Sequence, residues 1–264
     1  MTDFQIMIFG VAFIFVMTTA GSALIFFFRK NIGEKFNKIF LGFAAGVMIA
    51  ASVWSLLIPA IEQSSNEGWG TWSFVPAAIG FLAGGLFLLL IDVVVPHFHS
   101  GTHAEEGVHT HLKKTTKLFL AVTIHNIPEG LAVGFAFGAA LALNSHGAYM
   151  AALGLALGIG IQNFPEGAAV SLPMWEETKS KGKAFLMGFA SGAVEPVAAI
   201  IGIILASQIA AVLPWFLAFA AGAMIYVVVE ELVPEAHLGE HSNFGTWGVM
   251  IGFVIMMILD VALG

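Results

Sequence analysis

Two near-copies of one short motif place polar and charged residues inside apolar stretches of the chain. Residues 125–130 read HNIPEG, and residues 162–167 read QNFPEG. Imidazole, carboxylate and amide groups are ligands for divalent metal ions. Ionisable groups at membrane depth are costly, so their default interpretation is an ion pathway. The paired motifs therefore predict a site for a divalent cation inside a membrane.

Helical geometry would gather the ligand-type residues of each motif on one side of its helix. Residues i and i+4 share a helix face, and i+1 lies about 100° from i. The groups presented in this way are His125, Asn126 and Glu129 from the first motif, and Gln162, Asn163 and Glu166 from the second. Each motif proline also lacks an N–H and frees a backbone carbonyl. Such freed groups are tolerated at membrane depth where they line a cavity.

A third carboxylate, Glu195, precedes Pro196 in a later apolar stretch and repeats the pairing of Glu with Pro. With Met48 as a thioether, the set of oxygen and nitrogen ligands suits Zn²⁺, Fe²⁺, Mn²⁺ or Cd²⁺. Each residue also has a purely structural interpretation. A single amide often holds membrane helices together, a single Glu can be a protonated structural acid, and Met48 can be a packing residue.

Composition places the chain among membrane proteins. Of its 264 residues, 58% are hydrophobic and 10% are charged, against about 25% charged in soluble domains. Cysteine is absent, which excludes disulfides and thiolate metal sites. A membrane span needs about 20 mostly apolar residues. We therefore expect one all-α transmembrane domain over residues 1–264 with eight helices, at roughly 4–28, 37–61, 73–95, 116–143, 147–173, 183–207, 212–235 and 244–263.

The basic residues predict the orientation of these helices. All ten Lys and Arg lie in the first, third and fifth connections, within 29–38, 113–117 and 179–183. These connections share one side, which the positive-inside rule assigns to the cytoplasm. Both termini are then extracytoplasmic, in a multi-pass protein of the cell (inner or plasma) membrane.

The sequence also repeats itself in reverse orientation. Residues 43–49 read FAAGVMI and residues 219–225 read FAAGAMI, while a Gly-Thr-Trp triplet begins both the third and the eighth helix, at Gly70 and Gly245. These pairs cross the membrane in opposite directions, so they predict an inverted repeat of helices 1–3 and 6–8 around a central helix 4/5 pair. Inverted repeats are typical of transporters. Chance similarity among Gly/Ala-rich helices is the alternative.

Two further groups could bind metal on the cytoplasmic side. The connection 96–115 is rich in histidine, a composition that indicates metal binding, although a solvated polar loop is the alternative. Glu230 and Glu231 end helix 7 and could line an exit path or mark the interface, and His237 follows them. The histidines of the connection are His97, His99, His103, His109 and His111.

The eight helices, the histidine-rich loop and both motifs together resemble the ZIP (Zrt/Irt-like) metal transporters, in particular their prokaryotic GufA-like branch. The resemblance implies uptake of Zn²⁺ and related ions through a binuclear site. One ion would be held by Met48, His125, Glu129, Gln162 and Glu166, and its neighbour by Asn126, Glu129, Asn163, Glu166 and Glu195. It also implies a homodimer and an elevator-like motion of helices 1, 4, 5 and 6 against helices 2, 3, 7 and 8.

Two positions depart from the family pattern. Relatives carry His where this chain has Gln162, and an acid where it has Asn163. Three carboxylates then remain for two dications, which puts occupancy of the second site in question.

The resulting hypothesis is a metal importer without covalent chemistry or a cofactor, whose partners are the ion and the lipid bilayer, with no nucleic acid. A metal-selective channel with the same ligands is the first alternative, and an exporter would use the same ligands too. An intramembrane di-metal enzyme is disfavoured, because neither the Glu-x-x-His nor the His-Glu-x-x-His spacing occurs.

Overall fold

The structure is a computed structural model that describes residues 1–27, 34–94, 97–98, 105–106, 114–208, 210–237 and 243–263. Within these residues, eight helical segments are long and apolar enough to cross a membrane, and the eight predicted spans are confirmed. Five spans are single α-helices or nearly so, and the first four of them are α1 (Asp3–Ala23, extended by η1, Leu24–Phe26), α4 (Phe74–Val94), α5 (Lys114–Leu143) and α6 (His146–Thr178). The last, α11, covers Phe244–Leu263.

The other three spans are interrupted. The second consists of α2 (Glu34–Ala51), the π-helix η2 (Ser52–Leu57) and α3 (Ile58–Ser64). The sixth consists of α7 (Lys181–Gly192) and α8 (Val194–Gln208), and the seventh of α9 (Leu213–Val227), the π-helix η6 (Val228–Leu232) and α10 (Val233–Ala236). The remaining elements are η3 (Ser65–Trp69), η4 (Gly70–Trp72), η5 (Ala210–Val212) and two paired two-residue strands, β1 (His97–Phe98) and β2 (Glu105–Glu106).

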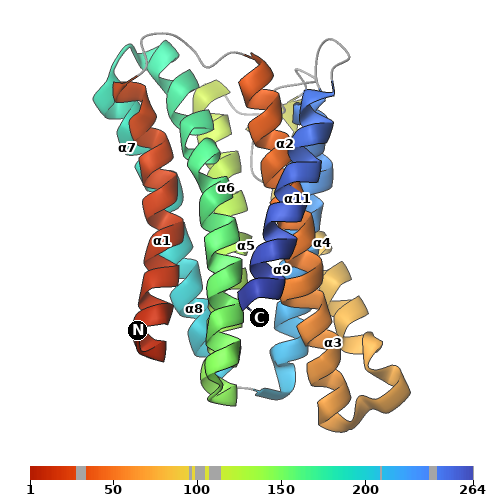
Figure 1. Cartoon of the computed structure of the whole chain (residues 1–264). Helices are drawn as coiled ribbons and strands as arrows, with labels where there is room; N and C mark the ends of the chain where they lie inside the picture. The colour runs from red at the N-terminus through yellow and green to blue at the C-terminus, as the bar shows by residue number, and fades with distance from the viewer. Residues whose placement is uncertain are drawn as a thin grey trace.

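The helices form two groups that lie side by side (Figure 1). In one, α1 packs along α6 and α5 packs along α8, and we call α1, α5, α6, α7 and α8 the motif bundle because it carries both motifs. In the other, α2 packs along α11 and α4 packs along α9, and we call α2, η2, α3, α4, α9, η6, α10 and α11 the scaffold bundle. Contacts of α5 with α9, and of α6 with α2 and α11, join the bundles.

Small residues let helices approach closely within each bundle. A Cβ added to Gly84 on α4 would collide with the backbone of Phe219 on α9. In the motif bundle, a Cβ on Gly167 of α6 would collide with the carbonyl of Thr18 on α1. Such close backbone contact is the main source of helix association in lipid, where no hydrophobic effect drives helices together.

The two scaffold spans that share a sequence repeat also share a local distortion. The π-helix η2 follows the repeated segment 43–49, and η6 follows 219–225; a proline, Pro59 or Pro234, comes soon after each. The packing follows the same relation. If spans 1, 2, 3 and 4 are exchanged with spans 6, 7, 8 and 5, the α1–α6 pair takes the place of the α8–α5 pair, and the α2–α11 pair takes the place of the α9–α4 pair. These features agree with an inverted repeat, which stays a prediction.

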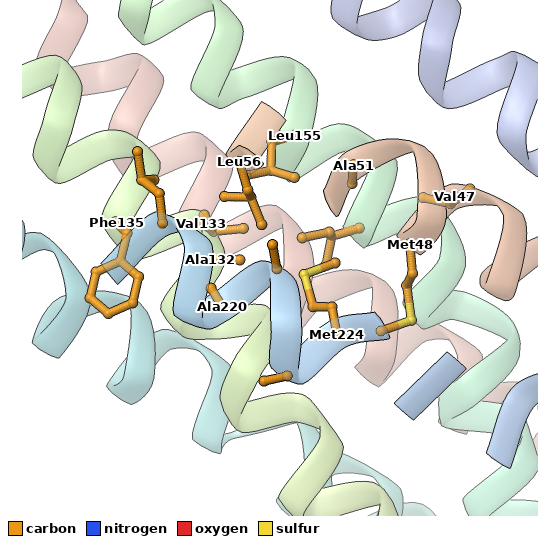
Figure 2. Close-up of a cluster of buried hydrophobic side chains, with 14 of the residues drawn as sticks. Val47, Met48, Ala51, Leu56, Ala132, Val133, Phe135, Leu155, Ala220 and Met224 are labelled. Carbon is orange, nitrogen blue, oxygen red and sulfur yellow. The ribbon is translucent and has the colours of Figure 1, made fainter. Parts of the chain in front are cut away.

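Apolar side chains fill the contact between the bundles. Figure 2 shows residues of the scaffold bundle, such as Met48, Leu56 and Met224, beside Val133 and Leu155 of the motif bundle. Large apolar side chains also cover the outside, where Leu82 of α4 is 70% exposed and Val261 of α11 is 74% exposed. A surface of this kind suits lipid rather than water, so the chain is a multi-pass membrane protein.

Candidate metal site

The two motifs lie in the interiors of the neighbouring helices α5 and α6. Both helices continue through their motif prolines, Pro128 and Pro165. His125, Asn126 and Glu129 of the first motif are buried, as are Gln162 and Asn163 of the second, whereas Glu166 is half-buried. Polar groups so deep within apolar helices require partners.

A hydrogen bond joins the two motifs directly. The Nε2 atom of Gln162 donates to Oε1 of Glu129 at 2.5 Å and also to Oδ1 of Asn163 at 3.2 Å. The amide nitrogen of Gln162 is therefore directed at the neighbouring side chains, and its carbonyl oxygen points elsewhere. The prediction that the motifs meet at one depth is thus consistent with this contact.

The break between α7 and α8 brings a backbone carbonyl, at the end of α7, to the site. Pro196 has no N–H to continue the helical hydrogen bonds, and α7 gives way to α8 at Ala193, whose own dihedral angles remain in the right-handed helical region. The carbonyl of Ser191 accepts a hydrogen bond from Nδ2 of Asn126 at 2.8 Å. This bond orients the Asn126 amide so that its oxygen is left for another partner.

Glu195 is fully buried in the first turn of α8. Its Oε1 accepts a hydrogen bond from the Thr18 hydroxyl of α1 at 2.6 Å. The charges of Glu166 and Glu195 act on Glu129, and the charge of Glu166 acts on Glu195. Three carboxylates from three helices thus lie within electrostatic reach of one another, an arrangement that a bound cation would relieve.

Several oxygens at this site have no hydrogen-bond partner among the described residues. They are buried, and leaving such a group unpaired typically costs about 1–3 kcal/mol. Oxygen atoms are ligands for divalent cations, so an ion between α5, α6 and α8 would offset this cost. The atoms are Asn126 Oδ1, Glu129 Oε2, Gln162 Oε1 and Glu195 Oε2.

The charged ligands are not closed around a single point. In the described part of the chain, no three His, Asp or Glu side chains converge closely enough to hold a metal ion. Amide oxygens would have to complete the coordination, or the carboxylates would have to turn toward the ion. The arrangement is therefore an open set of ligands, which suits binding followed by release.

His125 makes a contact that crosses between the bundles. Its Nε2 lies 2.6 Å from Oε1 of Glu231, in the π-helix η6 of the scaffold bundle. Glu166 lies within electrostatic reach of both residues. The sequence indicated that Glu231 lines an exit path or marks the interface, and its contact with a predicted ligand was not predicted.

The ligand-type residues lie toward one end of the site along the helices, and a large apolar cluster lies toward the other. Val133 follows Glu129 on α5 and Leu155 precedes Gln162 on α6, and both belong to the apolar cluster of Figure 2. Because α5 and α6 run in opposite directions, these residues lie on the same side of the site. His125 and Glu166 lie on the opposite side, which leads toward the lysine-rich ends of the helices.

The remaining predicted ligands have other contacts in the structure or lie outside the described residues. Met48 is fully buried in the apolar cluster beside Met224, and its role as a ligand stays a prediction. Glu230 is exposed, and the ring of His237 contacts the Val233 carbonyl at 3.0 Å and the Thr246 hydroxyl at 3.2 Å. For His97 only the backbone is described; the histidines outside the described residues are His99, His103, His109 and His111.

Two residues that the sequence analysis did not single out contact the site. Thr18 bonds Glu195, and the Ser191 carbonyl bonds Asn126. Thr18 and Ser22 lie one turn apart on an otherwise apolar helix, and this polar pair was the available signal. The partner of Ser191 is a backbone group, which no side-chain pattern could reveal.

Comparison with known proteins gives a consistent result. A family model described as ZIP Zinc transporter matches residues 114–260. The chain is 38% identical over 318 residues to Zinc transporter ZIP11 of Xenopus tropicalis, with 94% of each chain covered. It is 37% identical to Zinc transporter GufA of Myxococcus xanthus, with 85% of this chain and 86% of that protein covered. It is 35% identical to Zinc transporter ZIPB of Bordetella bronchiseptica, with 93% and 78% covered.

Proposed function

The chain belongs to the ZIP zinc transporter family, and we propose that its metal ion crosses the membrane through the buried site between α5, α6 and α8. It is a transporter and not an enzyme. The single observation that supports the site most strongly is the set of unpaired buried oxygens from Asn126, Glu129, Gln162 and Glu195. They belong to three helices, α5, α6 and α8, and a divalent cation bound among these helices would satisfy them.

The proposed cargo is Zn²⁺, with Cd²⁺, Fe²⁺ and Mn²⁺ as further substrates. The relatives are named as zinc transporters. One imidazole, from His125, stands among carboxylate and amide oxygens, and such a mixture binds borderline ions without strong selectivity. Gln162 in place of a second imidazole shifts the ligand set further toward ions that prefer oxygen.

The proposed direction of transport is into the cytoplasm. The apolar cluster separates the site from the end of the bundle that carries the α5–α6 connection. His125, Glu166 and Glu231 lie toward the opposite end, where the basic connections are found. By the positive-inside rule that end is cytoplasmic, and both termini are extracytoplasmic. The described arrangement would then be closed to the outside.

We favour a carrier of the elevator type over a channel. The motif bundle contains every buried carboxylate of the described residues, and glycine contacts hold α1 against α6 within it. Its contact with the scaffold bundle is largely apolar, so it could slide with few hydrogen bonds to break. In this proposal the His125–Glu231 contact forms and breaks as the bundles move.

Purified protein in liposomes tests the function. We expect saturable uptake of radioactive Zn²⁺, inhibited by Cd²⁺, with Glu166→Ala and His125→Ala each reducing the rate at least ~100-fold through loss of a ligand. Glu67→Ala, which removes an exposed carboxylate, serves as the matched control and should transport normally. Uptake that survives both site substitutions would exclude the proposed path. Non-saturating uptake would favour a channel.

We further propose that the protein functions as a homodimer in the cell membrane, formed through part of its exposed apolar surface. Mass measurement of the protein in lipid nanodiscs should give twice the mass of one chain. A single-chain mass at all concentrations would contradict the dimer without affecting the site.

A further inference from the structure

Helix α1 carries no predicted ligand, yet its middle is packed against the site. Thr18 is 1% exposed, and Ser22, one turn later, is fully buried. Added Cβ atoms on Gly167 of α6 and Gly192 of α7 would both collide with Thr18. The two glycines therefore allow α1 to pack closely against α6 and α7 at the depth of the site. Thr18 is the residue of α1 that occupies this close contact.

The Thr18 hydroxyl contacts Glu195, one of the three buried carboxylates. Its Oγ1 lies 2.6 Å from Oε1 of Glu195 and 3.2 Å from the carbonyl of Ile14 on its own helix. A hydroxyl has one proton to donate, and the shorter distance favours the carboxylate, since hydrogen bonds to charged acceptors are shorter and stronger. Thr18 thus holds one of the two carboxylate oxygens.

The other carboxylate oxygen is left for an ion. Glu195 is fully buried, and its Oε2 makes no hydrogen bond within 3.5 Å among the described residues, although the side chain of Asn163 lies near the carboxylate. The bond from Thr18 to Oε1 restricts rotation of the carboxylate, in an orientation that leaves Oε2 without a hydrogen bond among the described residues. Without this bond, the buried carboxylate could rotate about its terminal torsion, which has no sharp rotamer preference.

We propose that Thr18 is a positioning residue of the metal site, which acts by orienting Glu195 toward the ion. This inference rests on the proposed function. Residues that orient metal ligands typically contribute about 10- to 100-fold to metal affinity. The bond also ties α1 to α8, so the orientation of Glu195 depends on how α1 sits against the rest of the motif bundle.

Equilibrium dialysis of the detergent-purified full chain against Cd²⁺ tests the proposal. Four proteins form the central set: wild type, Thr18→Val, Glu195→Gln and the double variant. Valine keeps the shape of threonine and removes its hydroxyl. We expect each single variant to bind Cd²⁺ about tenfold more weakly. The double variant should bind no more weakly than Glu195→Gln alone, because Thr18 then has no carboxylate to orient.

Two variants control for packing. Thr18→Ser keeps the hydroxyl and should restore most of the affinity lost in Thr18→Val. Ser22→Ala removes a hydroxyl that bonds only the carbonyls of Thr18 and Gly167, each at 3.1 Å, and should bind as wild type does. If Thr18→Val cannot be purified, Thr18→Ala replaces it in the set of four proteins.

Three results would overturn the proposal: wild-type affinity in Thr18→Val, wild-type affinity in Glu195→Gln, or losses that multiply in the double variant. Multiplied losses would mean that Thr18 acts through helix packing and not through Glu195. Dialysis measures metal binding and therefore tests the role of Thr18. The transport proposal fails separately, if Glu166→Ala takes up Zn²⁺ at the normal rate.

Discussion

The motif bundle and the scaffold bundle are built by the same packing rule but differ in what they bury. Both bring helices together through glycines, at Gly167 in one and at Gly84 in the other. Among the described residues, the motif bundle buries two carboxylates, an imidazole and three amides, whereas the polar residues that the scaffold bundle buries are Lys38, Ser52 and Ser64. Similar helix contacts thus hold two very different interiors.

This difference indicates that the scaffold bundle mainly stabilises the fold, whereas the motif bundle gives up some stability to keep atoms available for a ligand. The scaffold bundle gains stability from nearly every buried group. The motif bundle keeps unpaired oxygens, such as Glu129 Oε2, at a cost of about 1–3 kcal/mol for each group. The Ser52 hydroxyl of the scaffold bundle is also buried without a partner among the described residues, but four of the unpaired oxygens belong to predicted ligands, as expected where the atoms are needed for an ion. Substitutions in the two bundles should therefore have opposite effects on folding.

The largest effect is expected in the scaffold bundle, at the contact of α4 with α9. Gly84→Val should destabilise the protein by at least ~3 kcal/mol, because its side chain collides with the Phe219 backbone. Gly85→Val is the matched control, since a Cβ there comes no closer than 3.9 Å to the carbonyl of Gly222. Thermal unfolding in detergent measures both. Equal melting temperatures would show that the close contact is not needed.

The next largest effect is expected in the motif bundle, with the opposite sign for stability. Glu129→Gln keeps an acceptor for Gln162 but removes a buried charge. In the absence of metal it should raise the melting temperature by about 2–4 °C, as ~1 kcal/mol does in a chain of this size. Zn²⁺ should stabilise the wild type and leave this variant unchanged. A lower melting temperature without metal would contradict the comparison.

The contact between the bundles should have an intermediate effect. Glu231→Gln weakens the partner of His125, whose side chain is 10% exposed against 17% for Glu231. Because the pair is mostly buried, breaking it costs more than the ~1 kcal/mol of an exposed pair, so we expect uptake kinetics to change by at least about fivefold. Because Glu231 competes with the ion for His125, the KM for Zn²⁺ should fall together with the maximal rate. A rise in KM would instead make Glu231 a ligand.

The smallest effect is expected at the edge of the motif bundle. Asp3 contacts His146 at 2.5 Å, and their side chains are 42% and 65% exposed. Exposed pairs contribute little, so Asp3→Asn should leave both the melting temperature and Zn²⁺ uptake within error of the wild type. A large loss of either would mean that the ends of α1 and α6 matter more than the bundle interior.

Much of this organisation could be predicted from the sequence because it is local. The eight spans follow from apolar segments of membrane length, and the ligand faces of α5 and α6 follow from helical spacing. The contact of Gln162 with Glu129 also agrees with the expectation that the two motifs meet.

The unpredicted parts are contacts between helices distant in the sequence. Nothing near Glu231 indicates that it faces His125, and nothing near Thr18 indicates that it bonds Glu195. Such pairs depend on the rotation of each helix, which packing sets and which local periodicity does not. The Ser191–Asn126 bond depends in addition on the break before Pro196.

The most direct test of the central claim is to locate the ion. Crystals of the protein grown with Cd²⁺ should give an anomalous-difference peak between α5, α6 and α8, within bonding distance of Glu129 and Glu166. Glu166→Ala crystals should lose that peak. Peaks confined to the histidine-rich connection, with none between the motif helices, would contradict the assignment of the metal site to the motif bundle.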